Sequence, residues 1–209
     1  MAPWNLLNFK KMNKIIYLLT VILGVGALPL QAESSPQADL EATVAEVVEI
    51  LYDPSVQLDA RQKQLEAALD SRFSFEVISQ RAVGHFWKRF KPEEKERFAG
   101  LFKELLIQSY TSGLEADDLG SKPEISWEGQ RELKKGLIEI SSSIRMDNSR
   151  FPIVYRMAKL ENGWQVYDIL VEGVSLIGNY RKQFAGILQR GNMEDLFSAL
   201  KQKVEANKS

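Results

Sequence analysis

Residues 72–114, RFSFEVISQRAVGHFWKRFKPEEKERFAGLFKELLIQSYTSGL, are the stretch that decides the fold. At its centre, Pro92 and the acidic residues that follow it are typical of the first turn of a helix, where carboxylates interact favourably with the helix dipole. Apolar residues then recur at steps of three and four, which predicts one broad apolar stripe. The stripe consists of Phe98, Leu101, Phe102, Leu105, Leu106 and Tyr110. A stripe of this width must pack against another apolar surface.

A shorter helix is predicted before the long one. Ser74 has the side chain of an N-cap residue, and Phe75 and Ile78 follow it at helical spacing. Small and aromatic side chains then occupy one compact turn, where Gly84 and Trp87 lie. The sequence therefore predicts a short helix and a tight turn that lead into the long helix.

Beyond this stretch the apolar period changes from about 3.6 to two, which indicates strands. Residues 136–147 alternate between apolar and polar side chains, and residues 151–160 repeat the pattern. An Asn-Gly pair at 162–163 is typical of a tight hairpin before a further strand at 164–171, and residues 124–131 add an edge strand. We expect four antiparallel strands with one apolar face.

Helices are predicted on both sides of these strands in the chain. Residues 39–51 and 58–69 have amphipathic spacing, with Arg61 on the outer side of the second helix. Residues 174–189 form another helix after the strands, and Asn192 caps a last one. The order of helices, sheet and helices predicts an α+β fold, in which a curved four-stranded antiparallel sheet has helices packed on one face.

The N-terminal segment is predicted to be an export signal. Three lysines precede an apolar run at 15–28, and Ala32 offers a small residue for cleavage. The run is shorter than the roughly 20 residues that a membrane-spanning helix needs, which favours a signal over a permanent anchor. We therefore expect residues 1–32 to be a cleavable signal peptide and 33–209 to form a single α+β domain, with Met12 as an alternative start.

Charge balance and cysteine content limit the classes of function. The chain has 27 Lys and Arg against 28 Asp and Glu, so nothing in this balance suggests binding to nucleic acid. It has no cysteine, which excludes disulfides, thiolate catalysis and sulfur-bound metals. The single histidine, His85, lies in an apolar turn, so we expect a structural or surface role for it.

Two acidic residues leave one enzymatic alternative open. Asp168 and Glu172 flank the end of a predicted strand, where two carboxylates can serve as base and acid in a small α+β enzyme. Asp168 would then be the base of an isomerase or hydratase. We favour a structural interpretation, in which Asp168 holds a turn or an arginine and Glu172 lies near a helix N-terminus.

Basic residues provide candidates for contacts with anions. The cluster at 88–91 is either a solvated surface or a docking site for an acidic partner. Five arginines are candidates for a contact with phosphate, because guanidinium matches phosphate in a forked geometry. They are Arg72, Arg81, Arg145, Arg156 and Arg181. We expect structural ion pairing for most of them.

Two blocks of the sequence resemble the signatures of a known family. Within 72–114, F-x-F is followed by A-V-G-x-x-W and then by P-E-E and F-x-x-x-F-x-x-L-L-x-x-x-Y-x-x-x-L. The second block is YDILVEGVSL at 167–176, with N-Y-R at 179–181. Together they resemble the MlaC family, also called toluene-tolerance auxiliary proteins. The resemblance covers roughly residues 39–197.

The resemblance implies a periplasmic phospholipid carrier of a Gram-negative envelope, which is not an enzyme and needs no cofactor or metal. The acyl tails are expected in an apolar cavity between sheet and helices. Each exposed methylene costs about 0.8 kcal/mol, so about fourteen would cost roughly 11 kcal/mol outside such a cavity. The implied partners are an inner-membrane ABC transporter with a lipid-binding ring and an outer-membrane lipoprotein complexed with a porin. We expect a monomer, and a carrier of hopanoid-type polycyclic lipids is the alternative within this class.

On this resemblance, the abundant aromatic side chains are expected to line the cavity rather than fill a solid core. The long helix would form one wall, the strands the other, and the helix after the strands would close one end. The predicted lipid-binding residues are Phe75, Phe98, Phe102, Leu105, Tyr110, Ile140, Ile144, Ile153, Tyr155, Trp164, Tyr180 and Phe184.

Overall fold

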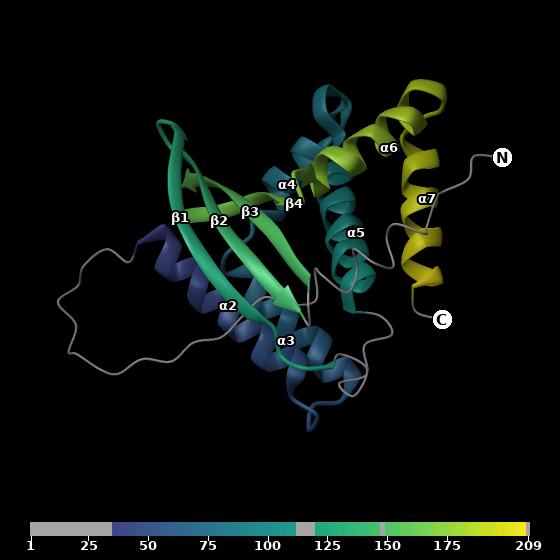
Figure 1. Ribbon diagram of the computed structural model, residues 1–209. Helices are drawn as coiled ribbons and strands as arrows, with labels where there is room; N and C mark the ends of the chain where they lie inside the picture. The colour runs from purple at the N-terminus through teal and green to yellow at the C-terminus, as the bar shows by residue number, and fades with distance from the viewer. Residues whose placement is uncertain (1–34, 112–119, 147–148, 208–209) are drawn as a thin grey trace.

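The structure is a computed structural model that describes residues 35–111, 120–146 and 149–207 (Figure 1). The signal peptide expected at 1–32 lies outside the described residues. Helices precede and follow an antiparallel sheet, which confirms the predicted α+β class. The elements are α2 (Pro36–Tyr52), α3 (Leu58–Asp70), α4 (Phe75–Val83), the 3-10 helix η1 (Gly84–Arg89), α5 (Pro92–Thr111), β1 (Glu124–Lys134), β2 (Leu137–Met146), β3 (Ser149–Leu160), β4 (Gly163–Val171), β5 (Val174–Ser175), α6 (Leu176–Arg190) and α7 (Met193–Ala206).

The sheet has five strands in the order β1-β2-β3-β4-β5, and each neighbouring pair is antiparallel. The expected count of four is wrong because β5 was missed. This strand has two residues, Val174 and Ser175, which is too short to produce an alternating pattern. The helix predicted at 174–189 includes these two residues, whereas α6 begins at Leu176.

Local signals in the sequence set several helix ends as predicted. The Ser74 hydroxyl accepts a hydrogen bond from the backbone N–H of Val77 at 3.3 Å and so caps α4. Helix α5 begins at Pro92, and Asn192 caps α7. None of the described helices is both long and apolar enough to span a membrane.

The apolar interior consists of two clusters. The first, here called the sheet cluster, lies between the sheet and helices α2 and α3. Its buried members are Leu40, Val44, Leu51, Leu65, Ile138, Ile140, Ile144, Ile153, Tyr155, Met157, Val166 and Val171. The second, the helix cluster, is formed by buried side chains of α4, η1, α5, α6 and α7. Figure 1 shows this division, with the curved sheet over α2 and α3 and the other helices beside it.

Arg61 lies inside this fold rather than on the outer side of α3, where it was expected. It is only 5% exposed. Its guanidinium donates hydrogen bonds to the backbone carbonyls of Asp53 and Val56 at 2.9 and 3.1 Å. The reason for the error is that helical spacing does not show whether a long polar side chain folds back onto the preceding turn.

Candidate functional site

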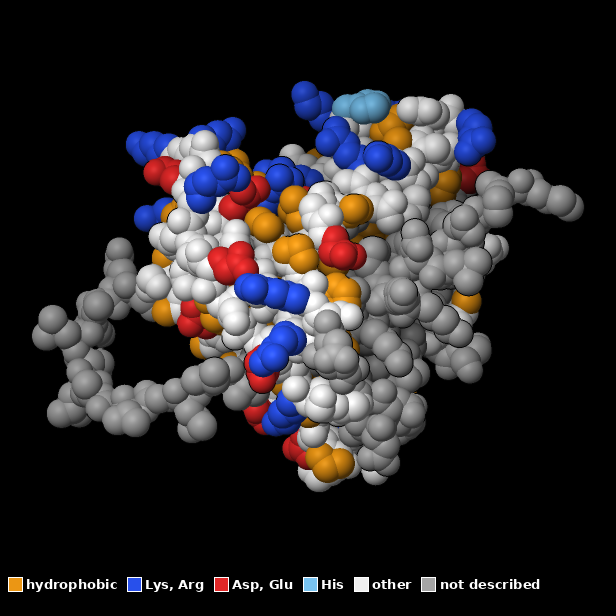
Figure 2. Space-filling model, in the orientation of Figure 1, with side chains coloured by type: hydrophobic (Ala, Val, Ile, Leu, Met, Phe, Trp, Pro, Cys, Tyr) orange, Lys and Arg blue, Asp and Glu red, His pale blue; other side chains and the backbone are white. Residues whose placement is uncertain are grey.

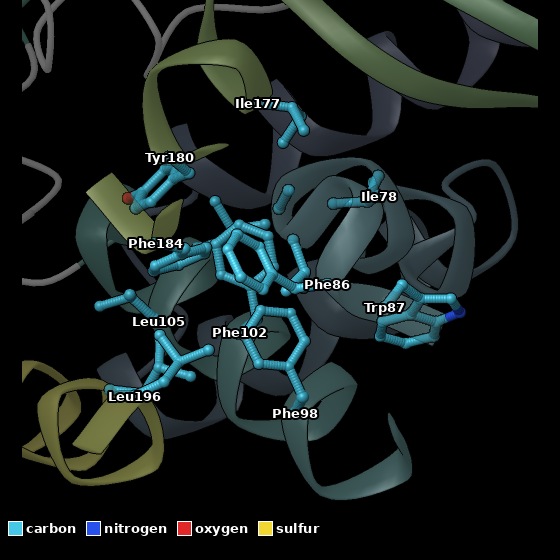
Figure 3. Packing of buried hydrophobic residues seen from close by; sticks show 14 of the residues in the cluster. Ile78, Phe86, Trp87, Phe98, Phe102, Leu105, Ile177, Tyr180, Phe184 and Leu196 are labelled. Carbon is cyan, nitrogen blue, oxygen red and sulfur yellow. The ribbon is translucent and has the colours of Figure 1, made fainter. Parts of the chain in front are cut away.

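The helix cluster is built around the ring of Phe102 on α5 (Figure 3). The centroid of this ring lies 5.5 Å from that of Phe98, 5.0 Å from that of Tyr180 and 5.2 Å from that of Phe184. The two rings from α6 meet it edge-on, an arrangement that aromatic quadrupoles favour. Leu105, one turn along α5, is buried in the same cluster. The structure thus brings five predicted lipid-binding residues together.

Four further predicted residues lie in the sheet cluster. Ile140 and Ile144 on β2, and Ile153 and Tyr155 on β3, are each at most 1% exposed. The period of two places them on the face that α2 and α3 cover. Trp164 on β4 is partly buried and packs against the same cluster.

The two predicted walls of the cavity therefore belong to different clusters. The α5 stripe packs against α6 and α7, and α2 and α3 cover the sheet. Phe73, just before α4, packs against both clusters, whereas Phe75 is partly buried and packs against the helix cluster. The side chain of Tyr110 lies outside the described residues. A lipid-binding role for these residues stays a prediction.

The sheet cluster encloses two hydroxyl groups. Tyr155 is 0% exposed and Ser142 is 1% exposed. Their hydroxyls face each other, but neither oxygen has a hydrogen-bond partner of good geometry within the described part of the chain. Burial raises the pKa of Tyr155 far above its ordinary value. Buried polar atoms without a partner are rare, and an oxygen atom of a bound ligand can satisfy such groups.

Asp168 is a structural residue at the start of α6. Its Oδ1 accepts a hydrogen bond from the backbone N–H of Ile177 at 3.1 Å, and its Oδ2 accepts one from the Ser175 hydroxyl at 2.7 Å. Oδ2 also lies 3.5 Å from Nη1 of Arg156. For Asp168 the structural interpretation is thus confirmed, and the alternative in which Asp168 is a catalytic base is removed. Among the described residues, no three acidic or histidine side chains group closely enough to hold a metal ion.

The five candidate arginines fall into two classes. Three form ion pairs: Arg72 with Asp39, Arg145 with Glu124, and Arg156 with both Glu139 and Asp168. The other two, Arg81 and Arg181, form no ion pair with a carboxylate in the described ranges. The expectation that most of these arginines serve structural ion pairs is therefore confirmed.

Some of this arrangement was not visible to sequence reasoning. The sequence predicts α2 and α3 as amphipathic helices, but it does not show that they cover the apolar face of the sheet. The signal was present in the run of apolar residues along α2, since a sheet with one apolar face requires a helix of this kind. The position of Ser142 could also be recognised from the sequence, because it is the one polar residue on the face of β2 that otherwise carries apolar side chains.

The MlaC family model matches residues 41–202, which is more than half of the chain. The chain belongs to the MlaC protein family. The resemblance seen in the two sequence blocks is thereby confirmed, although this MlaC-family chain has its sheet cluster and helix cluster packed separately.

Two known proteins are similar to this MlaC-family chain. It is 28% identical over 134 residues to the intermembrane phospholipid transport system binding protein MlaC of Haemophilus influenzae, over 62% of this chain and 61% of that protein's length. It also resembles a phospholipid-binding protein from Ralstonia solanacearum, solved in complex with a phospholipid, with a TM-score of 0.75. That match has 25% identity and covers 84% of this chain and 100% of the other.

Proposed function

We propose that this MlaC-family chain is a carrier that holds a phospholipid by its acyl tails and moves it between the membranes of the envelope. The observation that carries the proposal is the match, over 84% of the chain, to a protein solved with a phospholipid bound. The name of the Haemophilus relative, an intermembrane phospholipid transport protein, supports the same function. Such a carrier binds its cargo by burial and needs no catalytic group.

The tails, in this proposal, lie where the sheet cluster and the helix cluster meet. The two clusters share Phe73 as a common neighbour but otherwise consist of different side chains, so separating them would break fewer side-chain contacts than opening either one internally. Phe73 marks this boundary because it packs against both clusters. A lipid that enters the sheet cluster would meet the buried hydroxyls of Tyr155 and Ser142, which can donate to its ester oxygens.

The proposed location is the periplasm, reached by means of the signal peptide expected at residues 1–32. The proposed partners, which exchange lipid with the chain in a direction that the proposal leaves open, are the inner-membrane ABC transporter with its lipid-binding ring and the outer-membrane lipoprotein complexed with a porin. Energy for directional transport would come from the transporter, because the chain itself only exchanges one apolar environment for another.

Transfer of a fluorescent phospholipid between vesicles tests the proposal. The purified, lipid-free chain should accelerate the transfer, and Phe73→Trp should slow it severalfold because the larger ring fills the boundary. Leu101→Trp is the control, since Leu101 is partly buried and packs against the helix cluster. No acceleration by the folded wild-type chain would contradict the function, and equal rates for the two variants would contradict the position of the tails.

A further inference from the structure

Two segments of the chain carry positive charge without any acidic residue. Residues 77–91 contain Arg81, Lys88, Arg89 and Lys91, and residues 173–193 contain Arg181, Lys182 and Arg190. Neither segment contains Asp or Glu, although the whole chain has 28 of them. The first segment supplies most of α4 and η1, the second supplies α6, and these elements pack against one another. Positive charge is therefore concentrated where they meet.

Five of these side chains define what we call the basic face. They are Arg81, Lys88, Arg89, Arg181 and Lys182, and all are exposed. Figure 2 shows blue side chains gathered beside the pale blue side chain of His85, over η1 and α6. His85 is also exposed on this face.

The cations of the basic face are not held in close ion pairs with carboxylates of the described residues. The guanidinium of Arg81 instead lies 3.7 Å from the ring centroid of Tyr167, and that of Arg89 lies 5.5 Å from the ring centroid of Phe86. Stacking on a ring leaves the N–H groups at the edge of the guanidinium free to donate.

The guanidinium of Arg181 lies against the backbone of Gly84. A Cβ atom added to Gly84 would lie 2.7 Å from Nε and 2.9 Å from Nη2 of Arg181, so the guanidinium crosses directly above the glycine. This contact links the turn after α4 to α6. Three arginines are therefore positioned by rings or backbone before any partner arrives, which reduces the entropy lost on binding.

We propose that the basic face is a docking surface for an acidic protein surface, which this chain meets when lipid is loaded or delivered. The inference rests on the carrier function proposed above. Fixed guanidinium groups favour carboxylates, because each can form a two-pronged hydrogen bond with one. Membrane-inserting surfaces place large apolar side chains among their cations, whereas the large exposed apolar residues in the described ranges are Leu58, Leu133 and Val174. Leu58 and Leu133 lie in α3 and β1, and Val174 lies in β5, before the helix α6 that carries Arg181 and Lys182.

Binding of the full mature chain to the two membrane complexes proposed as its partners tests the docking surface. We expect binding to at least one complex that weakens as salt concentration rises. Lys88→Glu combined with Lys182→Glu should weaken this binding at least about tenfold. Both lysines are exposed and form no described ion pair, so the double variant should fold normally. The matched control is Lys134→Glu with Lys135→Glu, an equal charge change at exposed positions outside the basic face.

Three results would overturn the docking proposal. The first is equal binding by the wild type and the Lys88/Lys182 variant, and the second is equal weakening by both double variants. The third is salt-dependent binding to phosphatidylcholine vesicles that contain phosphatidylglycerol, with no binding to either protein complex.

Lipid extracted from each variant is measured in parallel. If the Lys88/Lys182 variant carries a normal amount of lipid and binds both complexes as the wild type does, the docking surface alone is refuted. If the wild type carries no lipid, the carrier function is refuted, and the binding data can still be interpreted.

Discussion

Glu139 on β2 shows how a single charged residue ties the strands together. Its Oε2 accepts a hydrogen bond from Arg131 at 2.5 Å, and its Oε1 accepts one from Arg156 at 2.9 Å. The hydrogen bond from Arg131, followed by that from Arg156, lowers the pKa of Glu139 below its ordinary value, against the opposing effect of burial. Three neighbouring strands are thereby joined through one carboxylate.

The lowered pKa of Glu139 predicts a pH dependence of stability. A carboxyl with a lower pKa in the folded state stabilises the protein above its unfolded pKa of about 4.3, and this contribution is lost as the pH falls through the folded pKa. Glu139→Gln should therefore lower the urea midpoint at neutral pH, and the difference from wild type should shrink under strongly acidic conditions. The control is Glu124→Gln, because Glu124 pairs with Arg145 at an exposed site. A difference that grows on acidification would contradict this account.

At Gly84, both the backbone conformation and the packing of Arg181 favour a residue without a side chain. Its φ of +63° is rarely adopted by residues with a side chain, and Arg181 occupies the space that a Cβ would need. Gly84→Ala should lower the free energy of unfolding by more than about 1 kcal/mol. Gly100→Ala, within α5 and with no atom near its added Cβ, should instead be neutral or stabilise by up to about 1 kcal/mol. Chemical denaturation of both variants checks this, and equal effects would count against the role of Gly84.

Single residues were predictable from the sequence where the cause is local. Ser74 and Pro92 act on their own helix ends, so a short window contains the whole signal. Asp168 was correctly expected to hold a turn or an arginine. Arg61 was misplaced, and the partners of Glu139 were not foreseen, because their contacts depend on how separate segments meet.

At the scale of elements, periodicity predicted type and position well. Helix α5 and the four long strands were expected close to where they lie, whereas β5 has too few residues to show a period. The identity of the covering elements was not predictable. An apolar stripe indicates that one face of a helix is buried, but it does not show which element packs against that face. In this structure α6 and α7 pack against the apolar face of α5.

Helix α5 should depend strongly on Phe102, which is 0% exposed and contacts rings from α5 and α6. Phe102→Ala in the lipid-free chain should lower the free energy of unfolding by about 3–5 kcal/mol, because it removes buried apolar surface and leaves a cavity. Leu101→Ala should have a smaller effect, since Leu101 is only partly buried. Urea denaturation followed by circular dichroism measures both. Similar losses for the two variants would show that the helix cluster is not centred on Phe102.

At the scale of the whole molecule, the sequence predicted the fold class, and the two blocks pointed to the family to which the chain belongs. The arrangement of the predicted lipid-binding residues was less predictable from the sequence than the fold. Residues expected on facing walls are divided between the sheet cluster and the helix cluster, with Phe73 packing against both. Composition and periodicity show which side chains are buried, but the division of a buried set into two packed groups is set by tertiary contacts.

The measurement that tests the central claim most directly is mass spectrometry of lipid extracted under denaturing conditions from the chain purified out of the envelope. The account predicts phospholipid in an amount close to one molecule per chain, with the mass identifying its head group and tails. A polycyclic lipid in its place would change the cargo, and folded protein that carries no lipid at all would contradict the account.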